Sequence, residues 1–173
     1  KAVDLLRTAI LKPRFDPDAI ERVRAQILST IKSDKTDPQT IAHRAFDKAA
    51  FGDHPYGSSL QGTLKSVAGI TRDDLVAAHR GALARDRLYV GAVGDITADE
   101  LAKLLDELLG ALPAKGAPMI GRADYQLKGG VTVIPFDTPQ SVVVFGQKGI
   151  TRDDPRFFDA YILNQILGGS GFN

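Results

Sequence analysis

The sequence has no cysteine, which excludes disulfides, thiolate metal sites and a cysteine nucleophile. Long hydrophobic runs are missing as well, and the apolar stretches that occur are far too short to span a bilayer. Neither sign of charge predominates, because 22 basic and 21 acidic residues leave a net charge of +1. Without a basic stripe or arm, neither nucleic-acid binding nor membrane insertion is expected.

Histidine is sparse, and its spacing argues against a metal site within the chain. The three histidines stand at 43, 54 and 79, so none forms the pair one helical turn apart, with a glutamate between, that a helical zinc site needs. His43 and His79 fall in helical patterns and are expected to pack or to face solvent. His54, beside Asp53 in DHPYG, is expected to lie in a turn and to have a structural role.

The composition is that of a folded domain or of parts of two. Hydrophobic residues make up 43% of the 173 positions and charged residues 25%, which is ordinary for a globular protein. The first residues show neither a signal pattern nor an initiating methionine, and the last, LGGSGFN, stop within a loop. We therefore expect a fragment of a larger protein.

Helical periodicity dominates the first two thirds of the chain. Apolar residues at helical spacing predict helices over 3–11, 17–34, 38–51, 72–83 and 98–112. Capping residues stand before four of them, namely Asp16, Asp37, Thr71 and Thr97. Pro17 and Pro38 take the first helical position of their segments, where a missing N–H costs nothing.

Strand patterns and a linker follow. Alternating apolar residues predict strands over 87–96, 131–137 and 141–150, and the Gly- and Pro-rich stretch 113–130 is interpreted as a linker. A last helix is expected to open at Thr151 and Pro155 and to end at Gly168 and Gly169. Helices and strands together indicate an α+β fold.

The motif GITRDD occurs twice, at 69–74 and at 149–154. In both copies the threonine is expected to be a helix N-cap, with an aspartate in the first turn. The first copy follows a helix and a loop, whereas the second follows a pair of strands. The identity is therefore interpreted as shared capping chemistry and not as an aligned repeat.

Several segments in one order resemble the pitrilysin/insulinase superfamily, peptidase family M16, and most of all its mitochondrial-processing-peptidase-like branch. They are AIERVRAQIL, FGDHPYG, GITRDDLVAAHRGALARDRLYVGAVGDI, TADELAKLLDELLGALP, FDTPQSVVVFGQKGI and ILNQILGGSGF. The resemblance implies two homologous α+β domains per subunit, and two subunits that enclose a chamber. On this template 1–112 is the second half of the first domain, 113–130 the linker, and 131–173 the opening strand, strand and helix of a second, inactive domain.

The resemblance also places the family's zinc chemistry. Two ligands come from a His-x-x-Glu-His helix that this chain does not contain, and the third is the last glutamate of Glu-Arg-x-Arg-x-x-Ile-x-x-Glu. Glu21 matches the first glutamate of that stretch, although a plain surface charge is the simpler interpretation, and Thr30 occupies the ligand position. A neutral hydroxyl is a poor replacement for a carboxylate on Zn²⁺. No catalytic residue and no cofactor are therefore expected in this chain, with zinc in a catalytic partner or a relative.

The C-terminal LGGSGF resembles the glycine-rich segment that non-catalytic subunits of the family present to substrate. This resemblance implies a substrate-binding role for five residues, Gly168, Gly169, Ser170, Gly171 and Phe172. The alternative is that the glycines only end a helix.

The function expected from the resemblance is that of a non-catalytic subunit that closes the chamber and helps to bind peptide. Its partners would be a peptide or protein substrate and a catalytic M16 subunit or a homodimer mate. Two alternatives stay open: an active M16 zinc endopeptidase whose His-x-x-Glu-His helix lies outside this chain, and a structural subunit like the core proteins of respiratory complexes. The expected compartment is the bacterial periplasm or cytoplasm, with the periplasm preferred.

Overall fold

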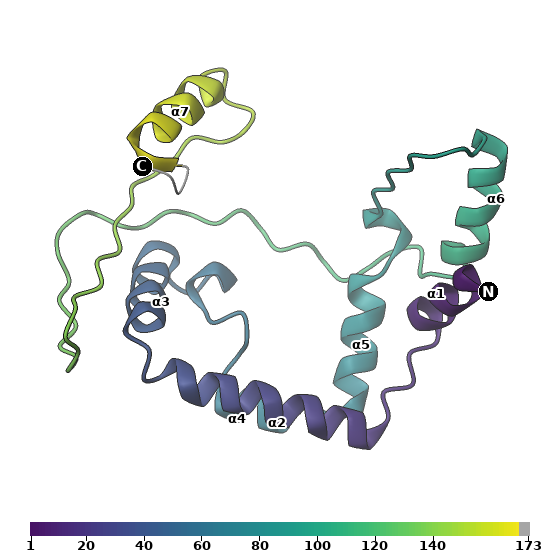
Figure 1. Ribbon diagram of the computed structural model, residues 1–173, viewed down its shortest axis with the longest axis horizontal. Coiled ribbons are helices and arrows are strands. Elements are labelled where there is room, and N and C mark those ends of the chain that lie inside the picture. Colours follow the sequence, from purple (N-terminus) through teal and green to yellow (C-terminus); the bar gives the residue numbers. More distant parts are fainter. Residues whose placement is uncertain (170–173) are drawn as a thin grey trace. The chain divides into compact units, whose positions relative to one another are not determined.

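The computed structural model describes residues 1–169, and their backbone contacts divide the chain into two units (Figure 1). Unit 1 consists of Lys1–Thr36 and Gln61–Arg122, and unit 2 of Asp37–Leu60 and Ala123–Asn173. Each unit therefore combines two separate stretches of the sequence. The domain boundaries expected at 112 and 130 are based on composition and on the family resemblance, and not on backbone contacts, so they stay a prediction.

Unit 1 is built from helices. They are α1 (Ala2–Leu11), α2 (Pro17–Asp34), α4 (Leu64–Gly69), α5 (Arg72–Ala82), the short 3₁₀ helix η2 (Arg85–Arg87) and α6 (Ala98–Leu109). The long α2 packs on α4, and α1 packs on α6 (Figure 1). The helices expected over 3–11, 17–34, 72–83 and 98–112 are thereby confirmed, with ends that differ by three residues or fewer.

Unit 2 contains the other helices of the described chain, α3 (Pro38–Phe51), the 3₁₀ turn η1 (Pro55–Gly57), α7 (Phe157–Asn164) and the π-helical turn η3 (Gln165–Gly169). α3 packs on η1. Phe51 is the centre of this contact, because the rings of Tyr56 and Tyr125 meet its ring edge-on at 5.7 and 6.1 Å. The helix expected over 38–51 is confirmed with these bounds.

The expected linker is attached at both ends. Within unit 1, Arg85 N–H donates to Pro113 O at 2.8 Å, and Ala117 N–H donates to Gly81 O at 2.9 Å. Within unit 2, Gln126 N–H donates to Ala50 O at 2.8 Å. Pro113, Ala117 and Gln126 are thus held by backbone hydrogen bonds, so a composition rich in glycine and proline does not by itself imply a free spacer.

The expected strands do not form. Residues 1–169 contain no β-strand, so the strands predicted over 87–96, 131–137 and 141–150 are not confirmed and only the helical part of the α+β class is seen. The apolar side chains of these stretches are exposed, with Tyr89 at 99%, Val131 at 91% and Phe145 at 90%. A strand needs a neighbour to pair its backbone and to cover its apolar face. The described residues provide neither for these segments.

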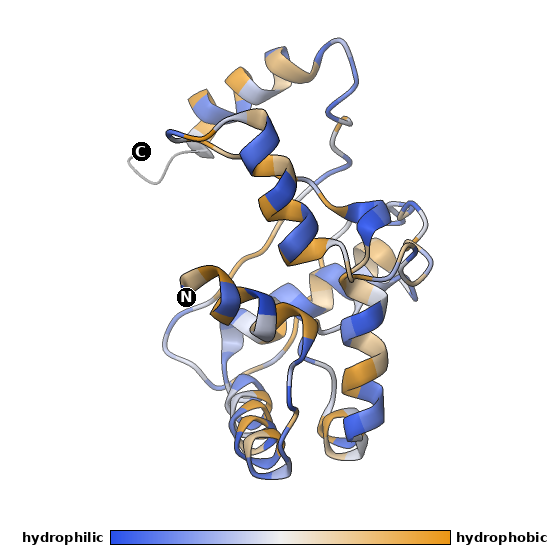
Figure 2. Ribbon diagram, turned by 90° about the vertical axis from the view of Figure 1, so that its right-hand side faces the viewer, coloured by the Kyte–Doolittle hydropathy of each residue, from blue (hydrophilic) through white to orange (hydrophobic). Residues whose placement is uncertain are grey.

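The core is correspondingly thin. Six apolar residues of the described chain are buried: Ile31, Ala50, Val67, Ala84, Leu108 and Leu112. The helices carry apolar and polar bands side by side (Figure 2), and much of the apolar side remains uncovered. Amphipathic helices gain most of their stability by burying the apolar face. The described residues therefore present apolar surface that they do not themselves cover.

Helix starts follow the sequence closely at three places. Thr63, Thr71 and Thr97 each accept a hydrogen bond from the backbone N–H three residues on, and the side chain of that residue accepts one in return. At α5, Asp74 accepts from Thr71 N–H at 2.8 Å and from its hydroxyl at 2.7 Å. These bonds hold the pKa of Asp74 below its usual value. The expected caps at Thr71 and Thr97 are confirmed.

The second GITRDD copy behaves differently from the first. α7 begins only at Phe157, and its first flanking residue, Arg156, makes no capping bond. Asp154 instead accepts hydrogen bonds from the Arg156 N–H at 2.9 Å and from its guanidinium. The prediction that Thr151 opens a helix is wrong. The cause lies in Pro155, the residue directly after the motif, because a proline disfavours the helical conformation at the residue before it, here Asp154.

We predict that the capping box at α5 makes stability sensitive to acid. The pKa of Asp74 is lower in the folded than in the unfolded state, so its contribution is present above the usual carboxyl pKa and is lost as pH falls through the folded pKa. Thermal unfolding of the full-length protein between about pH 5 and pH 3 should therefore depend less on pH in Asp74→Asn than in wild type. Asp73→Asn is the matched control, since Asp73 lies in the same first turn without a capping bond. Equal pH dependence in Asp74→Asn and wild type would contradict this account.

Candidate functional site

Helix α2 carries Glu21 and Thr30, the two positions that the resemblance aligns with the family stretch that ends in the third zinc ligand. Its 18 residues begin with Pro17 and run without interruption to Asp34. The Thr30 side chain is exposed, and its hydroxyl donates to Gln26 O at 3.2 Å, one turn back on the same helix. The hydroxyl at the ligand position therefore bonds within its own helix. Whether the chain binds zinc stays a prediction.

Glu21 is an ion-pair partner in this structure. Its carboxylate lies 3.1 Å from Nε of Arg24, one turn further along α2, and its side chain is 68% exposed. This arrangement agrees with the simpler interpretation of Glu21 as a surface charge of the helix. Within residues 1–169, no group of three or more His, Asp or Glu side chains is placed to hold a metal ion.

The histidines do not converge on a site. His54 caps η1, where its Nδ1 accepts the Tyr56 N–H at 3.2 Å and its ring meets the Tyr56 ring at 4.7 Å. The expected turn at His54 is thereby confirmed. The ring of His79 meets Phe15 edge-on at 6.0 Å, and its buried Nε2 has no hydrogen-bond partner in the described structure. His43 is exposed on α3.

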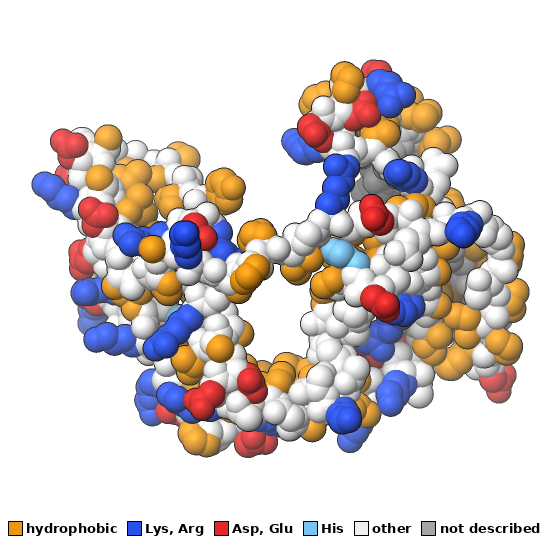
Figure 3. Space-filling view, turned by 180° about the vertical axis from the view of Figure 1, so that it is seen from behind, with side chains coloured by type: hydrophobic (Ala, Val, Ile, Leu, Met, Phe, Trp, Pro, Cys, Tyr) orange, Lys and Arg blue, Asp and Glu red, His pale blue; other side chains and the backbone are white. Residues whose placement is uncertain are grey.

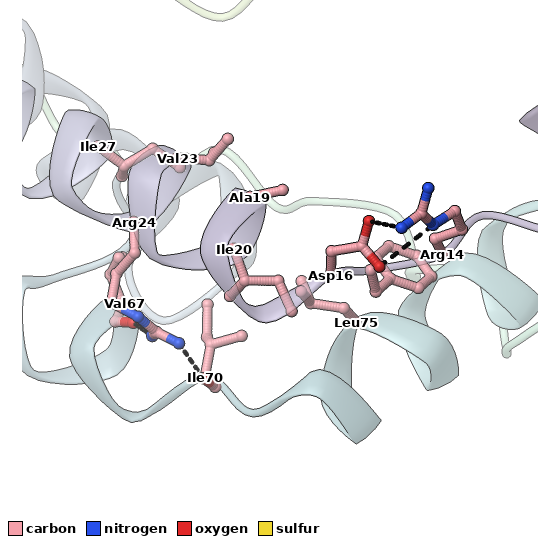
Figure 4. Close-up of a pocket in the computed structure, with 11 residues that line it drawn as sticks. Arg14, Asp16, Ala19, Ile20, Val23, Arg24, Ile27, Val67, Ile70 and Leu75 are labelled. Atoms are coloured by element: carbon pink, nitrogen blue, oxygen red, sulfur yellow. Dashed lines mark hydrogen bonds and ion pairs between the residues drawn. The ribbon is translucent and has the colours of Figure 1, made fainter.

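An apolar groove of about 480 Å³ lies between α2, α4 and α5 (Figure 4). Apolar side chains from the three helices face one another across it, and the residues that line it are Arg14, Phe15, Asp16, Ala19, Ile20, Val23, Arg24, Ile27, Val67, Ile70 and Leu75. Charged groups stand at its ends. Arg14 pairs with Asp16 at 2.8 Å, and Arg24 reaches from α2 to the backbone beyond α4 (Figure 4).

One residue of this groove, Phe15, has an uncommon backbone conformation. Phe15, between α1 and α2, has φ = +50°, a left-handed conformation that a bulky residue rarely adopts. Its ring lies against His79 of α5, and Arg72 of α5 donates to the neighbouring Arg14 O at 3.2 Å. These contacts from α5 hold the turn before α2. Sequence patterns gave no signal for the groove, because its residues come from two segments that are far apart in the sequence, 14–27 and 67–75.

Hydrogen bonds favour the charged form of six carboxyl groups in the described structure. In each of them the pKa lies below its usual value: Asp37, Asp53, Asp74, Asp86, Glu100 and Asp154. The first cause is a hydrogen bond in all six. Asp37, Asp74 and Glu100 make these bonds at helix starts, and Asp53, Asp86 and Asp154 make them in ion pairs. Figure 3 shows basic and acidic side chains interspersed on the face in view. Among the helices within residues 1–169, none has the length and apolar composition that crossing a bilayer requires.

The glycine-rich segment after α7 is described only in part. Gly168 has φ = +124°, which side chains rarely allow. At Gly169, an added Cβ would lie 2.9 Å from both the backbone O and the Nδ2 of Asn164. Both glycines are therefore required by the local backbone. Ser170, Gly171 and Phe172 lie outside the described residues, so the expected substrate-binding role of the segment stays a prediction.

Comparison with known proteins gives consistent matches. The family model described as "Peptidase M16 inactive domain" matches residues 69–172. An uncharacterized zinc protease of Mycobacterium tuberculosis is 30% identical over 97% of this chain and 39% of its own length, and a non-peptidase homolog of Helicobacter pylori is 28% identical over 98% and 39%. The crystal structure of a peptidase M16 inactive domain from Pseudomonas fluorescens matches with a TM-score of 0.65 and 28% identity, over 70% of this chain and 30% of that one. The chain thus spans about two fifths of the length of these curated relatives.

We predict that this chain binds no zinc at a specific site. Its histidines are dispersed and Thr30 presents a hydroxyl where a carboxylate ligand would be needed. Metal analysis of carefully purified protein should find zinc far below one equivalent. Stoichiometric zinc that disappears in His54→Ala or His43→Ala would show that these histidines are ligands and not structural.

Proposed function

Since the chain belongs to the peptidase M16 family, we propose that it is part of a non-catalytic subunit that closes a peptide chamber and helps to bind peptide. The observation that carries this proposal is Thr30, which is exposed on α2 and hydrogen-bonded within its own helix. A carboxylate at this position would project from the exposed face of α2 and could reach a metal, whereas the threonine hydroxyl is committed to Gln26 O. The matched family model covers residues 69–172 and is described as that of an inactive domain, which supports the absence of hydrolytic chemistry from that part of the chain.

The non-peptidase homolog of Helicobacter pylori gives further support, because it matches nearly all of this chain, although only 39% of its own length is matched. On this proposal the zinc and the chemistry of hydrolysis come from a catalytic M16 subunit. This chain would contribute surface to the chamber and contacts to an extended peptide.

An active zinc endopeptidase is the second candidate. It is favoured by the mycobacterial relative, whose name is that of a zinc protease and which is 30% identical to this chain. In that case the His-x-x-Glu-His helix would stand in the part of the protein that this chain does not include, and the third ligand would come from a residue other than Thr30. The two candidates differ in whether the full-length protein holds metal without a partner.

The glycine-rich segment is proposed as a peptide contact. Glycines leave backbone N–H and C=O groups uncovered, and an extended peptide can pair with such groups as an added strand does. Phe172 would supply an apolar contact beside that polar edge. The glycine geometry at 168 and 169 also fits a plain helix end, so a test must not depend on replacing these two residues.

We predict that the full-length protein alone lacks peptidase activity and gains it with a zinc-bearing M16 partner. The measurement is hydrolysis of a fluorogenic peptide library by each subunit and by the mixture, with metal analysis of each sample. Thr30→Glu in this subunit should leave the activity of the mixture unchanged, because zinc stays with the partner. Chelator-sensitive hydrolysis by the isolated full-length protein, at a rate that the partner does not raise, would refute the proposal and favour the endopeptidase.

We also predict that Phe172→Ala weakens peptide binding by the assembled complex by roughly tenfold, the loss expected when an apolar ring no longer covers the ligand. Phe158→Ala is the control, since Phe158 is 69% exposed on the neighbouring α7. The affinity is measured by titrating a fluorescent peptide into the intact complex. If Phe172→Ala binds peptide as wild type does while the complex remains assembled, the segment only ends the helix.

A further inference from the structure

The guanidinium of Arg24 connects α2 to the end of α4 through three backbone carbonyls. Nη1 donates to Val67 O and, at 3.3 Å, to Ala68 O, and Nη2 donates to Ile70 O at 2.7 Å. The Arg24 side chain is only 16% exposed, although it is charged. Figure 4 shows it turned from α2 toward Val67 and Ile70, along one wall of the apolar groove.

These carbonyls belong to a segment that has little stability of its own. α4 has six residues, which is about half the length at which an isolated helix becomes stable in water. The last carbonyls of a helix have no partner within it. At this helix end the partner is a cation, which suits the partial negative charge of the carboxyl end. Arg24 therefore adds a charged donor to the carbonyls at this end, of which Val67 O also accepts the Ile70 N–H at 3.4 Å.

The geometry requires arginine in particular. A guanidinium carries five N–H donors in a planar fork, so it can bond separate carbonyls and a carboxylate at once. Here the Nε side faces Glu21 at 3.1 Å while the two Nη groups face the carbonyls. Glu21 thus balances the charge of Arg24 and orients it. A lysine could reach one carbonyl but has no fork with which to bridge them.

We infer that Arg24 is a positioning residue that fixes the end of α4 and the turn into α5 against α2. Val67 and Ile70 lie at the carbonyls that it holds, and both side chains line the groove. Thr71, the N-cap of α5, follows Ile70 directly. One side chain on α2 thereby sets the wall of the groove and the starting point of α5. This inference does not depend on the proposed function.

Hydrogen exchange of the full-length protein tests the inference. In the wild type, Val67 N–H is bonded to Thr63 O at 2.9 Å and Ile70 N–H to Val67 O at 3.4 Å. Arg24→Gln should accelerate exchange of the amides from 67 to 71 by roughly tenfold to hundredfold, since hydrogen bonds from a charged donor are lost there. Amides of α1 and α6 should keep their rates. Arg24→Lys should show a smaller effect over the same residues.

The matched control is Arg22→Gln. Arg22 is exposed on the same helix, two residues before Arg24. This variant therefore removes one positive charge from α2 and leaves the bonds from Arg24 to the carbonyls in place. Its exchange rates at 67–71 should equal those of the wild type. Unchanged exchange in Arg24→Gln would overturn the inference, and so would equal acceleration in α1, α4 and α6, which would show a general loss of stability. If Arg24→Gln does not fold, Arg24→Lys carries the test with the same two overturning outcomes.

Discussion

Pairing of backbone N–H and C=O groups is the constraint on which the described structure depends. A helix satisfies most of these groups within one segment, whereas a strand must find them on a neighbour. Residues 1–169 meet the constraint with helices, turns and caps, and where a segment would need a neighbouring strand it stays extended with its apolar side chains exposed. Helix ends also need hydrogen-bond partners, and at the end of α4 Arg24 donates to the carbonyls of Ala68 and Ile70.

This constraint separates what the sequence could predict from what it could not. Helices α2 and α3 were predictable because apolar spacing, a leading proline and a preceding aspartate are all local signals. The strand pattern of 131–150 is just as clear, but a pattern records only a preference. Whether a ladder forms is decided by residues far away in the sequence. The likeness to a solved M16 inactive domain supports the family's fold for this chain, while the strands themselves are not seen here.

The two GITRDD copies show how narrow local signals can be. Six identical residues cap a helix in one place and form a turn in the other, because Leu75 follows the first copy and Pro155 the second. The candidate site illustrates the opposite limit. Thr30 and Glu21 could be placed on one helix from sequence alone, but the backbone carbonyls that Arg24 binds lie 43 to 46 residues away. No periodicity or motif within α2 indicates them.

The features of α2 bear on function together. A helix that presents a metal ligand must be held firmly, and here the bonds from Arg24 to the carbonyls of Ala68 and Ile70 fix α2 against the end of α4, although position 30 carries threonine. On the proposed function, α2 would keep this packing while position 30 supplies no metal ligand. A subunit that only closes a chamber still needs its walls in register with a catalytic mate, and a rigid helix serves this need without metal. On that proposal the packing of α2 on α4 would serve the shape of the chamber and its contacts, and not hydrolysis.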